Sequence, residues 1–295
     1  MLHPQARRAV DAGADALPAY AEGFSIEESR GASREEAAAE PREPVAHVED
    51  VDADGVPCRL YRPGGARPGV VLHLHGGGFV LHDVDVHDNA ARRLADRCAT
   101  AVLSVDYRRP PEHPFPAAPD DVSTVIGWLG AHAADHGIDG PAFVHGDSAG
   151  GNLALVAALR HEGFFTPVAL TYPFLDPQAA GASYDLEGVG FDPREAAWYW
   201  QQYAATEADL TDPDLAPLLS DRLATLPPTL VVTTEDDPLR DEGELLVTRL
   251  AELGVSVVGT RYLGQPHGFW RHPQVFDAAE PLTRQVAGFF ASHRP

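Results

Sequence analysis

Lysine is absent from this chain of 295 residues. All 22 of its basic residues are arginine, 44 residues are acidic, and the formal net charge is −22. An acidic excess of this size argues against binding to nucleic acid or to an anionic membrane surface, because both carry the same sign of charge. It would also repel an anionic substrate and therefore favours a neutral small molecule. Genome composition or adaptation to salt explains the excess more simply, so the charge alone does not identify the substrate.

Cysteine and long apolar segments are also scarce. Cys58 and Cys98 are too few for a disulfide framework, and each lies in a segment typical of a buried structural thiol. Arg7 and Arg8 are not followed by the apolar stretch of a secretion signal, and no segment approaches the length of a membrane span. We therefore expect a cytoplasmic protein without a membrane partner, either a monomer or a homodimer.

Short apolar segments alternate with helix-like segments along most of the chain. This alternation predicts one α/β domain with a mostly parallel sheet flanked by helices on both faces, and the first strands are expected to be antiparallel. The predicted strands are 45–51, 57–62, 69–75, 101–107, 142–146, 167–172, 229–234 and 255–262. The predicted helices are 86–98, 119–134, 149–161, 194–206, 241–253 and 276–291.

The N-terminal segment, residues 1–43, is rich in Ala, Glu and Arg and favours helices. Ser25 with Glu28, and Ser33 with Glu36, have the spacing of a capping box, which predicts helix starts at both serines. A partly disordered acidic tail is the competing interpretation.

One short motif indicates chemistry. Residues 146–151 read GDSAGG and lie between a predicted strand and a predicted helix. A serine on such a sharp turn exposes its hydroxyl, and the first N–H groups of the following helix can stabilise a negative charge. Ser148 is therefore a candidate nucleophile.

Three further motifs give this serine its context. The predicted strand 69–75 runs into His-Gly-Gly-Gly at 75–78, a loop whose N–H groups can approach one oxygen. Acidic residues follow the predicted strand 229–234, and His267 follows the predicted strand 255–262. The order Ser, then Asp, then His is that of α/β-hydrolases rather than of chymotrypsin or subtilisin.

With these motifs in place, the sequence resembles the bacterial hormone-sensitive-lipase-like esterases, a branch of the α/β-hydrolases. The matching segments are HGGGF at 75–79, YRRPPEHPFPAAPDD at 107–121, GDSAGGN at 146–152, LTYP at 170–173, LPPTLVVTTEDDPLRDEG at 226–243 and HGF at 267–269. The resemblance begins near residue 45 and continues to the C-terminus. It departs at His145, where the family usually has a small apolar residue, and this residue could alter the neighbouring site.

The resemblance implies an α/β-hydrolase fold with a helical cap. Residues 1–43 would form the N-terminal part of the cap, and residues 174–224, which interrupt the alternation and are rich in Pro, Gly and aromatic residues, its second part. Residues 44–173 and 225–295 would form the hydrolase core.

A catalytic triad is the interpretation that joins these motifs. Ser148 needs a base within hydrogen-bond reach, and His267 is the candidate. Asp237 would fix the imidazole tautomer and stabilise the imidazolium. It is preferred to Asp236 because it aligns with the Asp-Pro-Leu motif of the family and because Pro238 stiffens the turn after it.

Backbone N–H groups of Gly77, Gly78 and Ala149 are the candidates for an oxyanion hole. Supporting roles around them are expected for four polar residues. His75 would brace the glycine loop, and Asp147 and Asn152 would hydrogen-bond behind the serine. The family resemblance suggests a similar role for Glu112, for which a plain loop charge is an equally good interpretation.

Aromatic residues are the candidates for the substrate pocket, which suits acyl or aryl esters. The selected residues are Phe79, Tyr184, Phe191, Trp198, Tyr199 and Trp270, with Trp200 and Tyr203 as further candidates. Residues 198–200 cannot all face one side of a helix, so several of these side chains belong to the core.

The sequence contains clusters of histidine and aspartate but no recognised metal-binding or nucleotide-binding motif. His73 and His75 would share one strand face, and histidine and aspartate also cluster within residues 82–88. No metal-binding signature accompanies them, and no lysine follows the GDSAGG glycines as in a phosphate-binding loop. We therefore expect neither a metal nor another cofactor.

The sequence predicts a serine carboxylesterase that hydrolyses neutral short- to medium-chain esters through an acyl-enzyme on Ser148. A ligand receptor on the same fold is the main alternative, but receptors that resemble this family have lost the histidine, which is present here as His267. An amidase, a lactonase or an acyltransferase would use the same triad on a different bond or acceptor.

Overall fold

The computed structural model describes residues 2–12, 17–185 and 191–294. Its centre is a sheet of eight strands in the order β1-β2-β4-β3-β5-β6-β7-β8. β1 and β2 form an antiparallel hairpin and β2 also pairs antiparallel with β4, whereas the other neighbours are parallel. The strands are β1 (His47–Ala53), β2 (Val56–Arg62), β3 (Arg67–Leu74), β4 (Thr100–Val105), β5 (Ala142–Asp147), β6 (Phe165–Thr171), β7 (Thr229–Asp236) and β8 (Val257–Pro266).

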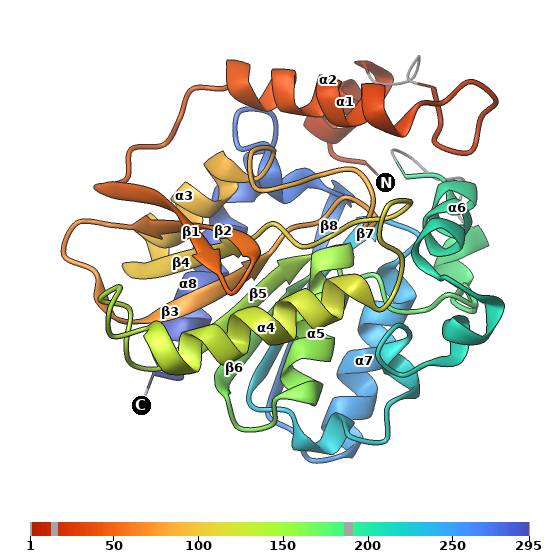
Figure 1. Cartoon of the computed structure of the whole chain (residues 1–295). Coiled ribbons are helices and arrows are strands. Elements are labelled where there is room, and N and C mark those ends of the chain that lie inside the picture. Colours follow the sequence, from red (N-terminus) through yellow and green to blue (C-terminus); the bar gives the residue numbers. More distant parts are fainter. Residues whose placement is uncertain (1, 13–16, 186–190, 295) are drawn as a thin grey trace.

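Helices cover both faces of this sheet (Figure 1). α4, α5 and α7 lie on one face, and α3 and α8 lie together on the other. The helices are α1 (Pro4–Ala12), α2 (Ile26–Ala39), α3 (Asp88–Cys98), α4 (Ala117–His132), α5 (Ala149–Arg160), α6 (Pro193–Tyr203), α7 (Arg240–Glu252) and α8 (Ala279–Ser292).

Successive side chains of the central strands enter two different cores, because a strand alternates its faces. On β3, Leu72 packs in the core shared with α4, α5 and α7, whereas Val71 packs in the core shared with α3 and α8. β4 and β5 are buried along their whole length, as expected for parallel strands covered on both sides. The α/β-hydrolase fold predicted from the sequence is confirmed by this arrangement.

The predicted elements agree closely with the observed ones. All eight strands and all six helices predicted for the hydrolase core and the 174–224 segment are present, with ends displaced by a few residues. Ser25 is the N-cap of α2 and accepts a hydrogen bond of 3.2 Å from the Glu28 N–H, so this helix start is confirmed. The start predicted at Ser33 is wrong, because Ser33 lies inside α2.

The N-terminal segment contacts the segment 174–224. The Ala19 N–H donates to Glu195 Oε1 at 3.0 Å, and the Tyr20 hydroxyl donates to Asp192 Oδ2 at 3.0 Å. Figure 1 shows α1 and α2 outside the layered core at one end of the molecule. The helix α6 that carries Glu195 is therefore tied to the N-terminal segment by side-chain hydrogen bonds.

Both cysteines, Cys58 and Cys98, are buried free thiols, as predicted. Within the described ranges, the structure contains no helix with the length and apolarity required to cross a bilayer.

Candidate active site

The parallel strands bring the candidate residues to one edge of the sheet. Ser148 follows β5, Asp237 follows β7 and His267 follows β8. The carboxyl ends of parallel strands lie at the same edge, where α/β proteins usually bind ligands. The glycine loop that begins after β3 reaches this edge as well.

Ser148 occupies a strained turn between β5 and α5. Its φ of 56° and ψ of −121° lie outside the regions that non-glycine residues favour. The turn requires the glycines on either side, because a Cβ on Gly146 would lie 2.0 Å from Gly150 O and a Cβ on Gly150 would lie 1.9 Å from Leu74 O. The sequence GDSAGG thus permits a turn that exposes the serine hydroxyl to a cavity.

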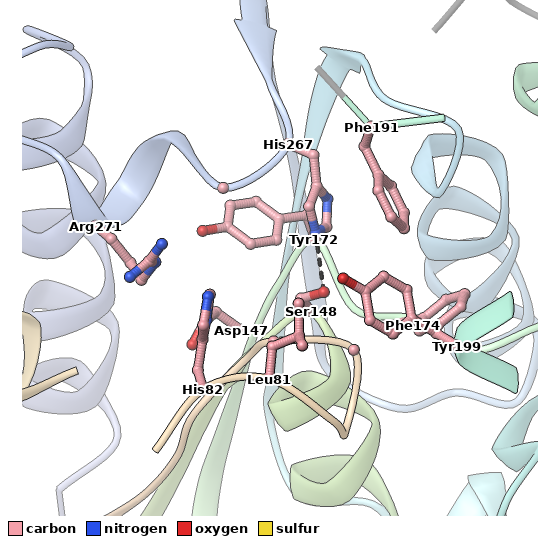
Figure 2. Close-up of a pocket in the computed structure, with 13 residues that line it drawn as sticks. Leu81, His82, Asp147, Ser148, Tyr172, Phe174, Phe191, Tyr199, His267 and Arg271 are labelled. Atoms are coloured by element: carbon pink, nitrogen blue, oxygen red, sulfur yellow. Dashed lines mark hydrogen bonds between the residues drawn. The ribbon is translucent and has the colours of Figure 1, made fainter. Parts of the chain in front are cut away.

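Ser148, His267 and Asp237 form a continuous hydrogen-bonded chain (Figure 2). The distance from His267 Nε2 to Ser148 Oγ is 2.9 Å, and the distance from His267 Nδ1 to Asp237 Oδ2 is 2.8 Å. With Nδ1 protonated, Nε2 can accept the serine proton. The arrangement can therefore activate a serine hydroxyl as a nucleophile.

Asp237 is itself held in place by hydrogen bonds. Its Oδ2 also accepts from the Thr234 hydroxyl at 2.7 Å, and its Oδ1 accepts from the Leu239 N–H at 2.9 Å. The residue is only 1% exposed. Buried carboxylates are stable when hydrogen bonds replace water, so this one can remain charged beside an imidazolium.

The glycine loop lines the cavity next to the serine. Gly77 has a φ of 113° and Gly78 a φ of 60°, in a region that residues with a side chain rarely adopt. A Cβ on Gly78 would lie 2.2 Å from Cδ1 of Tyr199. Ala149 is the first residue of α5, where N–H groups have no acceptor within the helix. The backbone around Ser148 thus offers N–H donors from two segments.

His75 contacts the loop backbone and does not line the cavity. Its Nδ1–H donates to Gly76 O at 2.9 Å, and its ring stacks on Tyr107 at a centroid distance of 4.2 Å. The Tyr107 hydroxyl donates to His75 O at 2.7 Å. Burial and the charge of Arg109 lower the pKa of His75 to about 3, so the ring is neutral.

Asp147 connects the turn that carries Ser148 to the same glycine loop. Its Oδ1 accepts a hydrogen bond of 3.1 Å from the Gly76 N–H. Burial raises the pKa of Asp147 to about 6. This carboxyl group therefore lies directly behind both Ser148 and the glycine loop.

Asn152 and Glu112 anchor the outer segments. Asn152 Nδ2 donates to Phe174 O and to Leu215 O, each at 2.9 Å, and so ties α5 to the segment 174–224. Glu112 is an exposed side chain that accepts hydrogen bonds of 2.8 and 3.1 Å from Arg30 of α2. Glu112 thus connects α2 to the loop after β4 and does not contact the cavity.

The cavity at Ser148 has a volume of about 180 Å³. Two of the predicted pocket residues, Phe191 and Tyr199, line it. The complete lining is Gly77, Gly78, Leu81, His82, Asp147, Ser148, Tyr172, Phe174, Phe191, Tyr199, His267, Gly268 and Arg271.

Three other predicted pocket residues belong to packing contacts instead. Phe79 is 1% exposed and stacks face to face on Tyr203 at 3.8 Å. The Tyr184 hydroxyl donates to Glu242 at 3.1 Å, and the Trp198 ring packs on the edge of Phe24. Of the further candidates, Trp200 and Tyr203 are buried in the same aromatic core.

Trp270 is also outside the cavity, and the reason is local geometry. It lies in a 3₁₀ turn, Phe269–Arg271, in which successive side chains are rotated by about 120°. Its ring is fully buried toward α8, where Nε1–H donates to Thr283 at 3.0 Å. The next residue, Arg271, faces the cavity.

The sequence analysis missed several lining residues. Tyr172 and Phe174 follow the carboxyl end of β6, so the rule that parallel strands end at the ligand-binding edge could have suggested them. Leu81, His82 and Arg271 carry no comparable signal, because their direction depends on loop and turn geometry.

Three buried residues, two of them histidines from the groups weighed in the sequence analysis, come close enough to suggest a metal. His73, His87 and Asp147 each place one potential ligand atom within 4.8 Å of the others. Burial lowers the pKa of His87 well below its usual value, and the charge of Arg271 lowers it further. Because Arg271 lies close enough to act on His87, its positive charge also opposes a bound cation, and we assign no metal to these residues.

His145, the departure noted in the sequence, does not line the cavity either. It stacks on His73 of the neighbouring strand at a centroid distance of 5.1 Å, with their Nδ1 atoms 3.0 Å apart, and its Nε2 lies 3.1 Å from Thr171 Oγ1. It belongs to the buried region near Trp270.

Comparison with known proteins supports a common family. The family model of the alpha/beta hydrolase fold matches residues 71–271. The chain is 39% identical over 272 residues to the carboxylic ester hydrolase LipN of Mycobacterium tuberculosis, covering 85% of this chain and 72% of that protein. It is 33% identical to the ethyl acetate hydrolase of Pseudomonas putida, covering 82% and 80% of the two chains.

Solved structures of esterases share the fold of this chain. An esterase from Pyrobaculum calidifontis superposes with a TM-score of 0.89 at 35% identity, over 99% of both chains. An esterase of the bacterial hormone-sensitive lipase family superposes with a TM-score of 0.88 at 25% identity, again over 99% of both chains. The fold and the edge-of-sheet site define an α/β-hydrolase. The chain belongs to this family, in the branch of hormone-sensitive-lipase-like esterases.

Proposed function

We propose that this protein is a serine carboxylesterase with Ser148 as its nucleophile. The observation that carries the proposal is the hydrogen-bonded chain from Asp237 through His267 to Ser148. The relatives named as ester hydrolases support the same reaction class.

The reaction follows from the positions of these groups. Ser148 Oγ attacks the ester carbonyl carbon while His267 Nε2 takes its proton, and Asp237 stabilises the resulting imidazolium. N–H groups of Gly77, Gly78 and Ala149 stabilise the negative oxygen of the tetrahedral intermediate. His267 then protonates the leaving alkoxide and the alcohol departs.

The acyl group is now bound to Ser148 as an ester. A water molecule gives a proton to His267 and attacks the acyl carbon, and collapse of the second intermediate returns this proton to Ser148. The products are a carboxylic acid and an alcohol, and no cofactor takes part.

The division of the chain into cap and core is part of the proposal. Residues 1–43 and 174–224 form the cap over a core of residues 44–173 and 225–295; residues 13–16 and 186–190 of the cap lie outside the described ranges. Phe191 and Tyr199 bring cap side chains into the small cavity, which favours esters of short to medium chain length. The protein acts as a monomer or homodimer in the cytoplasm, a location that the free thiols support.

A series of p-nitrophenyl esters from acetyl to palmitoyl, tested on the wild type and on Ser148→Ala, examines the proposal. Turnover of the short esters that disappears in the variant is the expected result. Near-complete activity in Ser148→Ala would refute the mechanism. Absence of turnover by the folded wild type on every ester would favour a ligand-binding protein.

The bond that is cleaved requires a separate comparison. An ester and an amide of the same acid distinguish an esterase from an amidase, because the amide needs stronger protonation of its leaving group. Addition of an alcohol to the ester assay distinguishes hydrolysis from acyl transfer, since an acyltransferase would form the new ester. We expect hydrolysis of the ester alone.

A further inference from the structure

The cavity has two chemically different sides, and Ser148 lies between them. Figure 2 shows Phe174, Phe191 and Tyr199 on one side of the serine, and Arg271, His82 and Asp147 on the other. Figure 2 also shows the Tyr172 hydroxyl directed toward Arg271. The first side consists of aromatic rings that suit a hydrocarbon chain, with the Tyr199 hydroxyl as its polar group near Ser148, whereas the second side is polar.

The polar side contains hydrogen-bonding groups without partners. Nδ1 of His82 is buried and makes no hydrogen bond within the described part of the chain, and the buried hydroxyl of Tyr172 finds no acceptor there, although the backbone of Trp270 lies close enough to act on it. Tyr172 is 1% exposed, so solvent does not satisfy its hydroxyl from outside. Buried polar groups are nearly always hydrogen-bonded, and groups left unpaired beside a cavity indicate that a ligand or ordered water completes them.

Arg271 is the cationic residue among these groups. It lines the cavity, and the ion pairs that the structure records among residues 2–12, 17–185 and 191–294 include none of this side chain. Most other arginines in those ranges are paired with carboxylates on the protein, as Arg30 is with Glu112. An unpaired guanidinium presents several N–H donors in the geometry that matches a carboxylate.

Asp147 does not neutralise this guanidinium by contact. Its Oδ1 is occupied by the Gly76 N–H, and the two side chains form no ion pair in the structure. The charged groups that line this side of the cavity are the guanidinium of Arg271 and the carboxyl group of Asp147, whose pKa burial raises to about 6. Of these two, the guanidinium is the one that pairs with a carboxylate, and at physiological ionic strength charges beyond about 8 Å are screened.

Space is available for a longer group beyond the serine. A second cavity of about 320 Å³ shares His267, Gly268 and Arg271 with the first and continues to Ala9 and Val10 of α1. Arg271 thus lines both cavities and lies in the wall of the cavity that contains Ser148.

We propose that Arg271 and the Tyr172 hydroxyl bind a carboxylate carried by the ester substrate, so that esters with a free carboxylate are better substrates than their neutral analogues. This inference rests on the proposed function and refines its substrate class. It also revises the expectation, drawn from net charge, that the substrate is neutral. The carboxylate belongs either to the acyl part, as in a monoester of a dicarboxylic acid, or to the alcohol part, as in an ester of a hydroxy acid.

Two matched pairs of substrates distinguish these sources. The pair that differs in the acyl part is p-nitrophenyl hemiglutarate and p-nitrophenyl pentanoate. The pair that differs in the alcohol part is 3-acetoxypropanoate and propyl acetate, whose hydrolysis is measured by the release of acid. The measured quantity is the ratio of kcat/KM for the charged member to that for the neutral member. We expect a ratio of about ten or more in one of the pairs, as a charge-assisted hydrogen bond provides.

Variants of Arg271 test whether this residue causes the preference for the charged substrate. In Arg271→Met this ratio should fall at least about tenfold, and Arg271→Lys, which keeps the charge but not the planar fork, should retain part of it. Arg284→Met, on an exposed part of α8, is the matched control and should leave the ratio unchanged. Thermal unfolding checks that each variant is folded.

Two results would overturn the proposal. One is a ratio below one in both pairs for the wild type, and the other is a preference that persists in Arg271→Met. Neither result would affect the proposed function, which fails only if neutral esters are not hydrolysed or if Ser148→Ala still hydrolyses them.

Discussion

The backbone N–H of Gly76 donates a hydrogen bond of 3.1 Å to Oδ1 of Asp147. One carboxyl group therefore connects the glycine loop after β3 with the turn that carries Ser148. In the mechanism proposed above, the first segment supplies oxyanion donors and the second supplies the nucleophile. Their relative position must hold to a fraction of an ångström, because donors act only at the place where the charge develops.

Replacement of Asp147 tests this connection. Asp147→Ala leaves the Gly76 N–H without its acceptor, and we expect kcat to fall by about 10- to 100-fold, less than for the complete loss of an oxyanion donor. KM should change less, because substrate contacts remain. Asp147→Asn keeps an acceptor oxygen and should retain more activity. Equal activities of the Ala variant and the wild type would show that other contacts hold the loop.

The proposed oxyanion loop also requires that Gly78 carry no side chain. A Cβ there would lie 2.2 Å from the Tyr199 ring, and the φ of 60° disfavours any other residue. We expect Gly78→Ala to lower kcat/KM strongly and to destabilise the fold by about 1–3 kcal/mol. Denaturant unfolding and ester kinetics measure the two effects.

A matched glycine provides the control for this variant. Gly127 lies inside α4 with nothing near its Cβ position, so Gly127→Ala should be neutral or stabilising by about 0.5–1 kcal/mol. Tyr199 is itself a buried core residue, so the clash is measured in a double-mutant cycle: Gly78→Ala should destabilise a Tyr199→Ala background less than it destabilises the wild type. An equal loss of stability in both backgrounds would show that the clash with Tyr199 is not the cause.

Substitution of Asp237 or of its neighbour Asp236 tests which carboxylate is the acid of the triad. Asp237→Asn keeps the volume but can no longer favour the His267 tautomer that accepts the serine proton, and we expect kcat to fall by about 10³- to 10⁴-fold. Asp236→Asn should remain near the wild-type rate, because His267 Nδ1–H donates its hydrogen bond to Asp237. The opposite pattern of rates would transfer the role to Asp236.

Stability should decrease on acidification because of buried histidines. Burial lowers the pKa of five histidines: His73, His75, His82, His87 and His145. The pKa of His73 is lowered to about 4 and that of His75 to about 3, and the pKa of the other three is held well below 6.5. The unfolded chain takes up protons on these side chains near pH 6.5 and the folded chain does not, so acid favours unfolding.

Buried carboxyl groups partly offset this effect. Burial raises the pKa of Asp147 to about 6 and also raises those of Asp106 and Glu242, so these groups bind protons in the folded state first. The five histidines outnumber the three carboxyl groups, so the unfolded chain should bind more protons than the folded chain between about pH 6 and 4, and the free energy of unfolding should fall with pH over this range. The contribution is fully present above pH 6.5 and is lost as the pH falls toward 4.

Denaturant unfolding across this pH range measures the slope. His145→Val removes one titrating group and should reduce the slope by about 1.4 kcal/mol per pH unit. A free energy of unfolding that stays constant between pH 7 and 4.5 would contradict the prediction.

The periodicity of apolar residues predicted the sheet and its helices, and the order of motifs, together with the family resemblance that selected Asp237 over Asp236, predicted the three groups now found in hydrogen-bond contact. Ser148, Asp237 and His267 could be predicted because each follows a strand in a parallel sheet, and such strands end at one edge. Aromatic content alone could not select the cavity lining. Trp270 and Arg271 are adjacent in sequence, yet one is buried against α8 and the other faces the cavity.

The sequence by itself therefore determined the local structure and the order in which the chemical groups reach the edge of the sheet, because strand and helix periods and turn glycines act over a few residues. The tertiary structure alone decided which side chains surround Ser148, that Arg271 lines the same cavity without an ion pair to any other described residue, and that His73 and His145 stack on neighbouring strands. These features depend on the direction of side chains in loops and on pairing between distant strands. Packing of the whole chain fixes both, and neither leaves a period in the sequence.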